Sequence, residues 1–486
     1  MGFAVVNGGV CKRPRGRSLC RLDGEKGTSN GTAVVVGGGP TGLGCAMVLA
    51  KQGWDDVIVA ERLPGCGPQS SSREYTYALK KRTMRFAEVM GFDDQLRHEG
   101  VAIDRLLLEV IDKSPERKRV EINAYDKDGV LYMRRKKLLK VLTDQIKDHY
   151  YSSVSIMFET QCVVKKDESD KLVVELRNLE GDLVKTVLPK LILACDGVHS
   201  KVRTTFETTY PQSFGRKIRS SPSAGLLYKA LRIKGEALNT SMHTSVILRG
   251  GSKPRERYLQ VGLFPSHEED TRRIGSIVLP EDNDLWKIDN CDECYEYFQE
   301  HFPRISVRDI IDLDDMKLFL SSTPGRFPHI QWSTGFHSVS ENAAYVILGD
   351  AAHSTPPDIG EGVNCCMEDL HVLHDSLQRH RNDLAAALED FEDARRSDVE
   401  ALMRITGYAH PYLYNQNSLM KKLWTAELAL RVVLNKILPI AFDQHIIFLI
   451  NEYSYSEALR RDLRTKTRIY FLTVASLSGL LYYLNI

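Results

Sequence analysis

The sequence has few cysteines and almost no net charge, and each shortage excludes a class of protein. Ten cysteines in 486 residues are too sparse for a disulfide scaffold and suit a reducing compartment. Cys291 and Cys294 form one C-x-x-C pair, but no second pair follows at zinc-site spacing, so we expect a polar helix there and no metal. The 65 basic and 64 acidic residues leave a charge of +1, which gives no support for nucleic acid as a partner.

The two ends of the chain lack the features of a folded domain. Residues 1–31 lack hydrophobic periodicity and predict a disordered leader. The basic residues of this leader are Lys12, Arg13, Arg15, Arg17 and Arg21. An organelle transit peptide is the alternative, which the acidic Asp23 and Glu25 weaken.

Charge is missing altogether from residues 469–486, which as a helix would extend roughly 27 Å, enough for a membrane core. Five basic residues between 460 and 468 precede this stretch, and such clusters stay on the cytosolic side. We therefore predict a C-terminal membrane anchor with a cytosolic body, on the mitochondrial outer membrane or another organelle membrane. The alternative is a terminal helix that packs on the body or lies flat in the interface.

A strand, a glycine turn and a helix follow the leader. The apolar run 33–36 predicts a buried parallel strand, 43–50 a helix and 57–60 a second strand. The turn fits G-x-G-x-x-G through Gly37, Gly39 and Gly42, which permit a tight turn, close approach of a pyrophosphate and helix–strand packing. Glu61, about twenty residues beyond the turn, is placed to accept hydrogen bonds from a ribose. The turn alone predicts a dinucleotide, either FAD or NAD.

The remaining pattern predicts an α/β fold in several parts. A nucleotide-binding domain would comprise residues 32–205 and 321–385, with further strands at 191–194 and 345–348. Residues 206–320 contain shorter alternating segments and predict an inserted β-rich substrate domain. Residues 386–468 predict a C-terminal helical region, followed by the anchor helix.

Two further motifs separate FAD from NAD. Residues 195–203 look like the Asp-Gly motif of the single-component flavoprotein aromatic hydroxylases, and residues 349–353 with the loop 357–364 look like their Gly-Asp motif. Together with the glycine turn, these motifs occur in the family's order, each at the end of a strand. Within that family the chain is most similar to the kynurenine 3-monooxygenases, from about residue 32 to the C-terminus.

The resemblance implies a Rossmann-type FAD-binding domain and a monooxygenase reaction. NADPH would reduce FAD, O2 would form a flavin C4a-hydroperoxide, and a small aromatic substrate would be hydroxylated. The implied substrate is L-kynurenine or a related tryptophan catabolite. The sequence leaves two alternatives: an FAD-dependent epoxidase or hydroxylase of a membrane lipid, isoprenoid or quinone, and a non-oxygenating, membrane-tethered flavin reductase.

The resemblance also implies roles for residues around the cofactor. Asp350 would bind the ribityl chain, Asp196 would lie near the pyrophosphate and help NADPH engage, and Arg135 would contact the phosphate or ribityl side. The loop 357–362 would run along the isoalloxazine, and the following helix would face its pyrimidine end. The full set assigned to the cofactor is Gly37, Gly39, Thr41, Gly42, Glu61, Arg62, Arg135, Asp196, Gly197, Asp350, Pro357, Gly360, Gly362, Val363 and Asn364.

Four residues are candidates for catalysis or substrate binding. Asn364 matches an asparagine near the substrate, with a helix N-terminal contact as the alternative. Tyr408 aligns with a tyrosine that holds the substrate carboxylate, with core packing as the alternative. Tyr125 would supply a second phenol, and Arg105 would be the carboxylate clamp.

Three further residues in or near the Gly-Asp motif are a histidine and a pair that departs from the family pattern. His353 invites a catalytic role, but we expect it to hydrogen-bond the loop, because lone histidines are usually structural. Asp358 and Ile359 replace an aromatic pair of the resembled enzymes. The departure puts a carboxylate beside the flavin, where burial is costly unless the group is paired.

Overall fold

A computed structural model describes residues 31–65, 75–111, 118–123, 129–167, 171–235, 239–250, 259–381, 383–410, 414 and 417–483. The predicted leader lies outside these ranges apart from residue 31. A six-stranded sheet, ordered β20-β21-β12-β1-β2-β8, forms the centre of the nucleotide-binding part. Its strands are β1 (Thr32–Val36), β2 (Asp56–Ala60), β8 (Val154–Met157), β12 (Leu191–Ala194), β20 (His337–Val339) and β21 (Ala344–Ile347).

The predicted parallel pairing is confirmed. β1 pairs parallel with β2 and β12, and β12 pairs parallel with β21; only β20 is antiparallel. These strands are apolar on both faces because helices and a second sheet cover them. The covering helices are α1 (Pro40–Lys51), α4 (Arg135–His149), α5 (Lys201–Thr209), α9 (Gly362–Arg379) and α10 (Leu384–Thr406). The small sheet is β11-β10-β9, from β9 (Gln161–Lys166), β10 (Leu172–Arg177) and β11 (Leu183–Val187).

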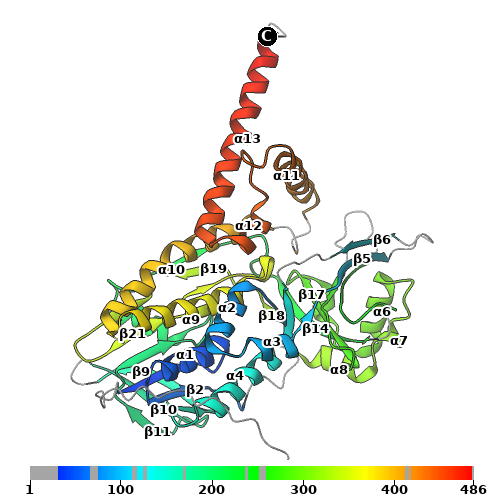
Figure 1. Cartoon of the computed structure of the whole chain (residues 1–486). Coiled ribbons are helices and arrows are strands. Elements are labelled where there is room, and N and C mark those ends of the chain that lie inside the picture. The colour runs from blue at the N-terminus through cyan, green and yellow to red at the C-terminus, as the bar shows by residue number, and fades with distance from the viewer. Residues whose placement is uncertain are drawn as a thin grey trace, which may run out of the picture.

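A seven-stranded, mostly antiparallel sheet forms the second part of the molecule (Figure 1). Its order is β18-β14-β17-β16-β15-β5-β6, from β5 (Arg105–Ile111), β6 (Lys118–Asn123), β14 (Leu227–Lys234), β15 (Thr244–Gly250), β16 (Gln260–Leu263), β17 (Arg272–Leu279) and β18 (Gly325–Arg326). Helices α6 (Cys291–His301), α7 (Val307–Ile310) and α8 (Leu313–Ser321) cover it. The helix expected around the C-x-x-C pair is therefore confirmed as α6.

One pairing departs from the predicted domain division. Residues 105–123 were expected in the nucleotide-binding domain, but β5 pairs parallel with β15 and carries β6 at the sheet edge. Between these parts lie β3 (Thr76–Leu79), α2 (Lys81–Met90), α3 (Asp93–Glu99), β4 (Val101–Ala102) and β7 (Leu131–Arg134). A further small sheet comprises β13 (Arg216–Arg219), β19 (Ile330–Ser333) and β22 (His353–Ser354). The 3-10 turns are η3 (Asp284–Lys287), η4 (Gly349–Ala351) and η5 (Pro357–Ile359).

The predicted C-terminal helical region, residues 386–468, is helical: its first helix, α10, packs on α9, and its last helix projects away from the body (Figure 1). It contains α11 (Ser418–Ile437), α12 (Ile446–Glu452) and α13 (Tyr455–Tyr483), so the basic cluster and most of the predicted anchor form one continuous helix. Within the part of the chain that the structure describes, no helix is both long enough and apolar enough to cross a membrane. Residues 484–486 of the predicted anchor lie outside the described ranges.

Candidate active site

The glycine turn joins β1 to α1 with no room for side chains at two positions. Gly37 has φ +105°, and a Cβ there would lie 2.5 Å from the Cys195 carbonyl oxygen. A Cβ on Gly42 would lie 1.8 Å from the Gly37 oxygen. Gly39, in contrast, faces open space and caps α1 without a side-chain bond. The first amides of α1 are thus presented to an anionic ligand approaching over Gly39.

Glu61 secures this turn from the end of β2. Its Oε2 accepts a hydrogen bond from the Gly38 amide at 2.7 Å, and its Oε1 accepts one from the Leu63 amide at 2.8 Å. The carboxylate keeps further lone pairs for a ligand, so the predicted ribose contact stays a prediction. The neighbouring Arg62 is exposed.

The Asp-Gly motif follows β12 and lies against the glycine turn. Asp196 Oδ2 accepts hydrogen bonds from the amides of Lys201 (2.9 Å) and Val202 (3.3 Å), so Asp196 caps α5. Its Oδ1 is buried and accepts nothing from the described residues. Arg203, which is buried, donates to the carbonyls of Ala351 (2.7 Å) and Val198 (3.1 Å). Arg203 therefore ties the Asp-Gly motif to the Gly-Asp motif.

The Gly-Asp motif follows β21 and touches the same turn. A Cβ on Gly349, which has φ +60°, would lie 2.4 Å from the Thr41 hydroxyl. Burial by surrounding groups raises the pKa of the Asp350 carboxyl, against the opposing effects of His353 and Arg135. Asp350 is nevertheless exposed to solvent, although protein groups surround its carboxyl closely. A carboxylate that binds a cofactor requires this combination.

Arg135 approaches Asp350 from the start of α4. Its amide donates to the Tyr75 carbonyl at 2.9 Å, and its Nη1 is buried without a partner among the described residues. Burial works to lower the pKa of Arg135, but the phenols of Tyr77 and Tyr75 outweigh burial and raise it. A buried cation with an unused donor fits the anionic or polyhydroxyl part of a dinucleotide.

The loop between the Gly-Asp motif and α9 is backbone-lined and open. Gly360 has φ +64°, and a Cβ on Gly360 or Gly362 would meet nothing within 4 Å. Val363 is buried in the first turn of α9. The glycine turn, the orphaned Arg135 donor and this open loop together fit a dinucleotide bound along its length.

Comparisons with known proteins decide which dinucleotide is bound. The model of the family described as "FAD binding domain" matches residues 31–281, more than half of the chain. The chain belongs to the family of FAD-binding flavoprotein monooxygenases. It is 24% identical to kynurenine 3-monooxygenase of Candida albicans, over 78% of this chain and 79% of that protein. It is 23% identical to the Caenorhabditis elegans enzyme of the same name, over 89% of this chain and 92% of that protein.

Solved structures confirm the predicted fold of this flavoprotein. Klebsiella pneumoniae HpxO, crystallised with FAD and uric acid, matches with a TM-score of 0.56 at 18% identity, over 89% of this chain and 96% of that chain. The family match above, and not this likeness in fold, makes the protein an FAD-dependent monooxygenase and confirms the predicted cofactor FAD. The individual contacts to FAD stay predictions.

Two tyrosines beside the flavin site escaped the sequence prediction. Tyr75 and Tyr77 flank Thr76 where β3 begins, and their hydroxyls lie 3.3 Å apart. Burial raises the pKa of Tyr77 further above its ordinary value, so the phenol keeps its proton. Their alternation along one strand was the available signal, because alternate residues share a face of a strand.

Asn364 contacts the start of α2 and the loop before α9. Its Oδ1 accepts hydrogen bonds from the Lys80 amide and the Thr83 hydroxyl, both at 2.8 Å, at the start of α2. Its Nδ2 donates to the carbonyls of Ala78 (2.9 Å) and Gly360 (3.0 Å). With all four bonds made inside the protein, Asn364 fastens α2 to the loop, as the helix-contact alternative expects, and the substrate contact stays a prediction.

Asp358 is buried in this loop and is only partly satisfied. The Ser223 hydroxyl donates to Oδ1, whereas Oδ2 has no partner among the described residues. Burial raises the pKa of Asp358 to about 7, against the bond from Ser223. The cost that the sequence predicted for a buried anion is therefore met by a shift toward the neutral acid.

His353 belongs to a buried charge network. Its Nε2 lies 2.6 Å from Asp369 Oδ2, which also accepts a hydrogen bond from the Gly349 amide. His353, Cys365 and Asp369 could hold a metal by atom type and spacing. Arg395 Nε lies 2.9 Å from Asp369 Oδ1, and its Nη2 lies 3.1 Å from Cys365 Sγ, so a guanidinium already occupies the set. The network positions the Gly-Asp motif, and the hydrogen bond that was expected between His353 and the loop is made to Asp369 of α9 instead.

The structure commits Tyr408 to the C-terminal helix. Its hydroxyl donates to Asp462 Oδ2 at 2.8 Å, and the Lys466 ammonium lies 3.9 Å from its ring centroid. Asp462 is fully buried and pairs with Arg431 at 2.8 Å. These contacts match the packing alternative, because the phenol's only proton is already donated, and the grip on a substrate carboxylate stays a prediction.

The predicted carboxylate clamp, Arg105, lies in the second part of the molecule. Arg105 opens β5 next to the sheet edge, with ion-pair distances of 3.6 Å to both Asp104 and Glu121. Both pairs are partly exposed and weak, and the role of Arg105 as a carboxylate clamp stays a prediction. Tyr125 lies outside the described residues.

Proposed function

We propose that this FAD-dependent monooxygenase uses NADPH to hydroxylate a small aromatic amino acid, L-kynurenine or a related tryptophan catabolite. The observation that carries the proposal is the length of the match: the kynurenine 3-monooxygenases align over both the nucleotide-binding part and the part with the seven-stranded sheet. One oxygen atom of O2 enters the ring and the other leaves as water. When bound, FAD supplies the redox chemistry between NADPH, O2 and the ring.

The residues of this chain bind, orient and exclude water. Asp350 and Arg135 would hold the polar part of the cofactor, and the open backbone of the loop would lie along the flavin. An apolar cluster follows Ser223, which donates to Asp358 of the loop, and would suit an aromatic substrate if it borders the flavin. Its members are Leu226, Val278 and Phe327, with Tyr228 and Tyr414 packed against them. Such a wall packs an aromatic ring and keeps water from the reacting atoms.

The test measures NADPH oxidation by the purified holoenzyme with and without candidate substrates. We expect L-kynurenine to stimulate oxidation strongly and to yield a hydroxylated product. A membrane quinone or isoprenoid that stimulates oxidation where L-kynurenine does not would favour the alternative of an epoxidase or lipid hydroxylase. Oxidation of NADPH that no aromatic compound stimulates would remove the proposal.

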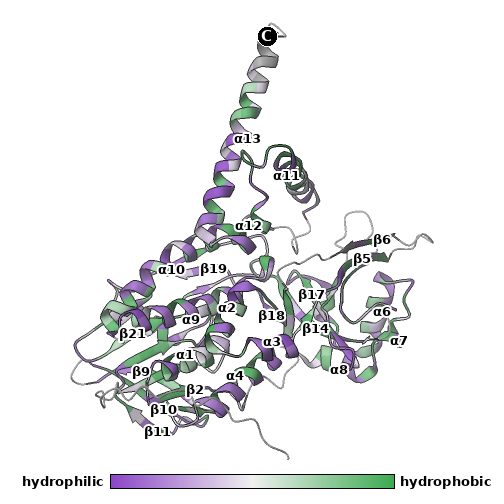
Figure 2. Ribbon diagram, viewed as in Figure 1, coloured by the Kyte–Doolittle hydropathy of each residue, from purple (hydrophilic) through white to green (hydrophobic). Residues whose placement is uncertain are grey.

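We also propose that the C-terminal region attaches the enzyme to a membrane, with the body on the cytosolic side. Figure 2 shows hydrophobic residues on α11 and on the outer part of α13, away from the body. The C-terminal apolar surface is defined by Leu419, Leu423, Leu430, Val433, Ile437, Leu438, Ile440, Tyr470, Phe471 and Leu472, all exposed. A surface of this size without a protein partner in the described chain is typical of interfacial contact with lipid. The mitochondrial outer membrane is the first candidate membrane.

A further inference from the structure

The loop of residues 357–362, the flavin loop, contains a buried carboxylate, Glu361, that the sequence did not single out. Its side chain is fully buried. Oε1 pairs with the Lys80 ammonium at 2.5 Å, and Oε2 accepts a hydrogen bond from the Tyr455 hydroxyl at 2.6 Å. Arg82 Nη1 lies 3.8 Å from Oε2. The charge is therefore satisfied by donors from two segments distant in the sequence.

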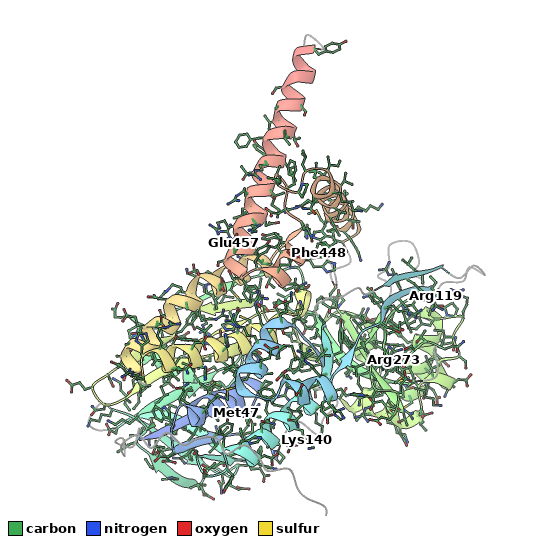
Figure 3. The ribbon with its side chains drawn as sticks, viewed as in Figure 1. Met47, Arg119, Lys140, Arg273, Phe448 and Glu457 are labelled. Atoms are coloured by element: carbon green, nitrogen blue, oxygen red, sulfur yellow. The ribbon has the colours of Figure 1, made fainter. Side chains whose placement is uncertain are left out.

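Tyr455 is the first residue of α13 and is completely buried. The Arg82 guanidinium lies 3.9 Å from the centroid of its ring and donates to the carbonyls of Ile450 and Tyr453, both at 2.7 Å. Figure 3 labels Phe448 on α12 and Glu457 on α13, at the base of the projecting helix where it meets the body. Helix α2, the flavin loop and the C-terminal region thus meet around one phenol.

The loop needs this support because of its glycines. Gly360 and Gly362 flank Glu361 and face open space, and glycine backbone adopts many conformations at little cost. Glu361 is the buried side chain between them, and Lys80 also donates to the Ile359 carbonyl at 3.3 Å. Holding the Glu361 carboxylate in place therefore fixes the path of the backbone on which the flavin would lie.

We propose that Tyr455 is a positioning residue of the flavin site: its hydroxyl, acting through Glu361, holds the flavin loop in the conformation that binds FAD. The base of the C-terminal helix is then part of the flavin site, although it lies far beyond the matched FAD-binding segment in the sequence. The inference rests on FAD binding and not on the identity of the substrate. Without the hydroxyl, Oε2 keeps only a distant cation, and a poorly satisfied buried carboxylate drives the loop to rearrange.

The test is Tyr455→Phe in the full-length protein, because phenylalanine keeps the ring on Arg82 and removes only the donor. We expect the dissociation constant for FAD, measured by titrating flavin-depleted protein, to rise about tenfold. The visible spectrum and the midpoint potential of the bound flavin should shift as well. Tyr408→Phe is the matched control, since it removes another hydroxyl–carboxylate bond of the C-terminal region without touching the loop. It should lower the melting temperature but leave FAD affinity and potential unchanged.

Three outcomes overturn the proposal. The first is an unchanged FAD affinity and potential in Tyr455→Phe. The second is an equal change in Tyr408→Phe, which would indicate general loosening. The third concerns Glu361→Gln, which should alter the flavin in the same direction: an unaltered flavin there, or fully additive effects in the double variant, contradicts action through Glu361. Glu361→Gln also decides the matter if Tyr455→Phe does not fold.

Discussion

The Asp358 carboxyl shows how a single residue can combine the chemistry of a site with a cost in stability. It is buried, takes one hydrogen bond from Ser223 and has a pKa raised to about 7. In the unfolded chain the pKa of an aspartate is about 4. The folded protein therefore binds a proton more tightly than the unfolded chain between about pH 4 and 7, and it loses stability as pH rises through that window.

Replacing Asp358 by Asn should remove this loss while keeping an acceptor for Ser223. At pH 5, near the start of this window, the variant should be only slightly more stable than the original protein. By pH 8 the variant should be more stable, by a few kcal/mol at most on the order given by a shift of this size. Thermal unfolding of flavin-depleted protein between pH 4.5 and 8.5 measures the difference. Curves that stay parallel across the range would show that Asp358 does not titrate in this window.

At the scale of elements, the sequence predicted the strands, turns and helices that depend on contacts between residues close together in the chain. The strand, turn and helix around Gly37 and Gly42 follow from apolar runs and from contacts between neighbours in the chain, and they are where expected. Contacts across long separations could not be read in this way. β5 joins the seven-stranded sheet through β15, and the Glu361 carboxylate accepts a hydrogen bond from Tyr455, 94 residues away. The sequence likewise could not show that the Tyr408 hydroxyl donates to Asp462, 54 residues away.

Substitutions in the glycine turn should affect protein stability and FAD affinity differently. Gly39→Ala adds a methyl group where no protein atom lies within 4 Å, so the flavin-depleted protein should keep its melting temperature. Its affinity for FAD should fall, because the methyl group enters the space through which a pyrophosphate approaches the backbone.

Gly42→Ala is the contrasting variant, since its methyl group would overlap the Gly37 carbonyl oxygen. It should lose several degrees of melting temperature before any flavin is added. Differential scanning calorimetry and FAD titration of both variants check the pair. Loss of stability in Gly39→Ala with unchanged FAD affinity would contradict the assignment of the turn.

At the scale of the whole molecule, the C-terminal region has two ends with different surroundings. The base of α13 is packed into the body next to the flavin loop, whereas its outer half and α11 expose apolar side chains (Figure 2). Leu423, Leu430 and Ile437 repeat every seven residues along α11 and so lie on one face of the helix. A single region therefore connects the proposed membrane contact to the flavin site through one continuous helix.

Replacing these three residues of α11 by Asp should detach the enzyme from lipid and spare the flavin. Each buried leucine or isoleucine contributes about 1.5–3 kcal/mol, so partition into vesicles should fall by at least about 100-fold. Flotation with phosphatidylcholine vesicles measures the partition, and absorbance at the flavin band checks that FAD is retained. The matched control replaces Leu179, Leu183 and Val184, which are as exposed but lie around the β10–β11 hairpin of the body. Equal flotation of both triple variants would show that α11 does not contact the membrane.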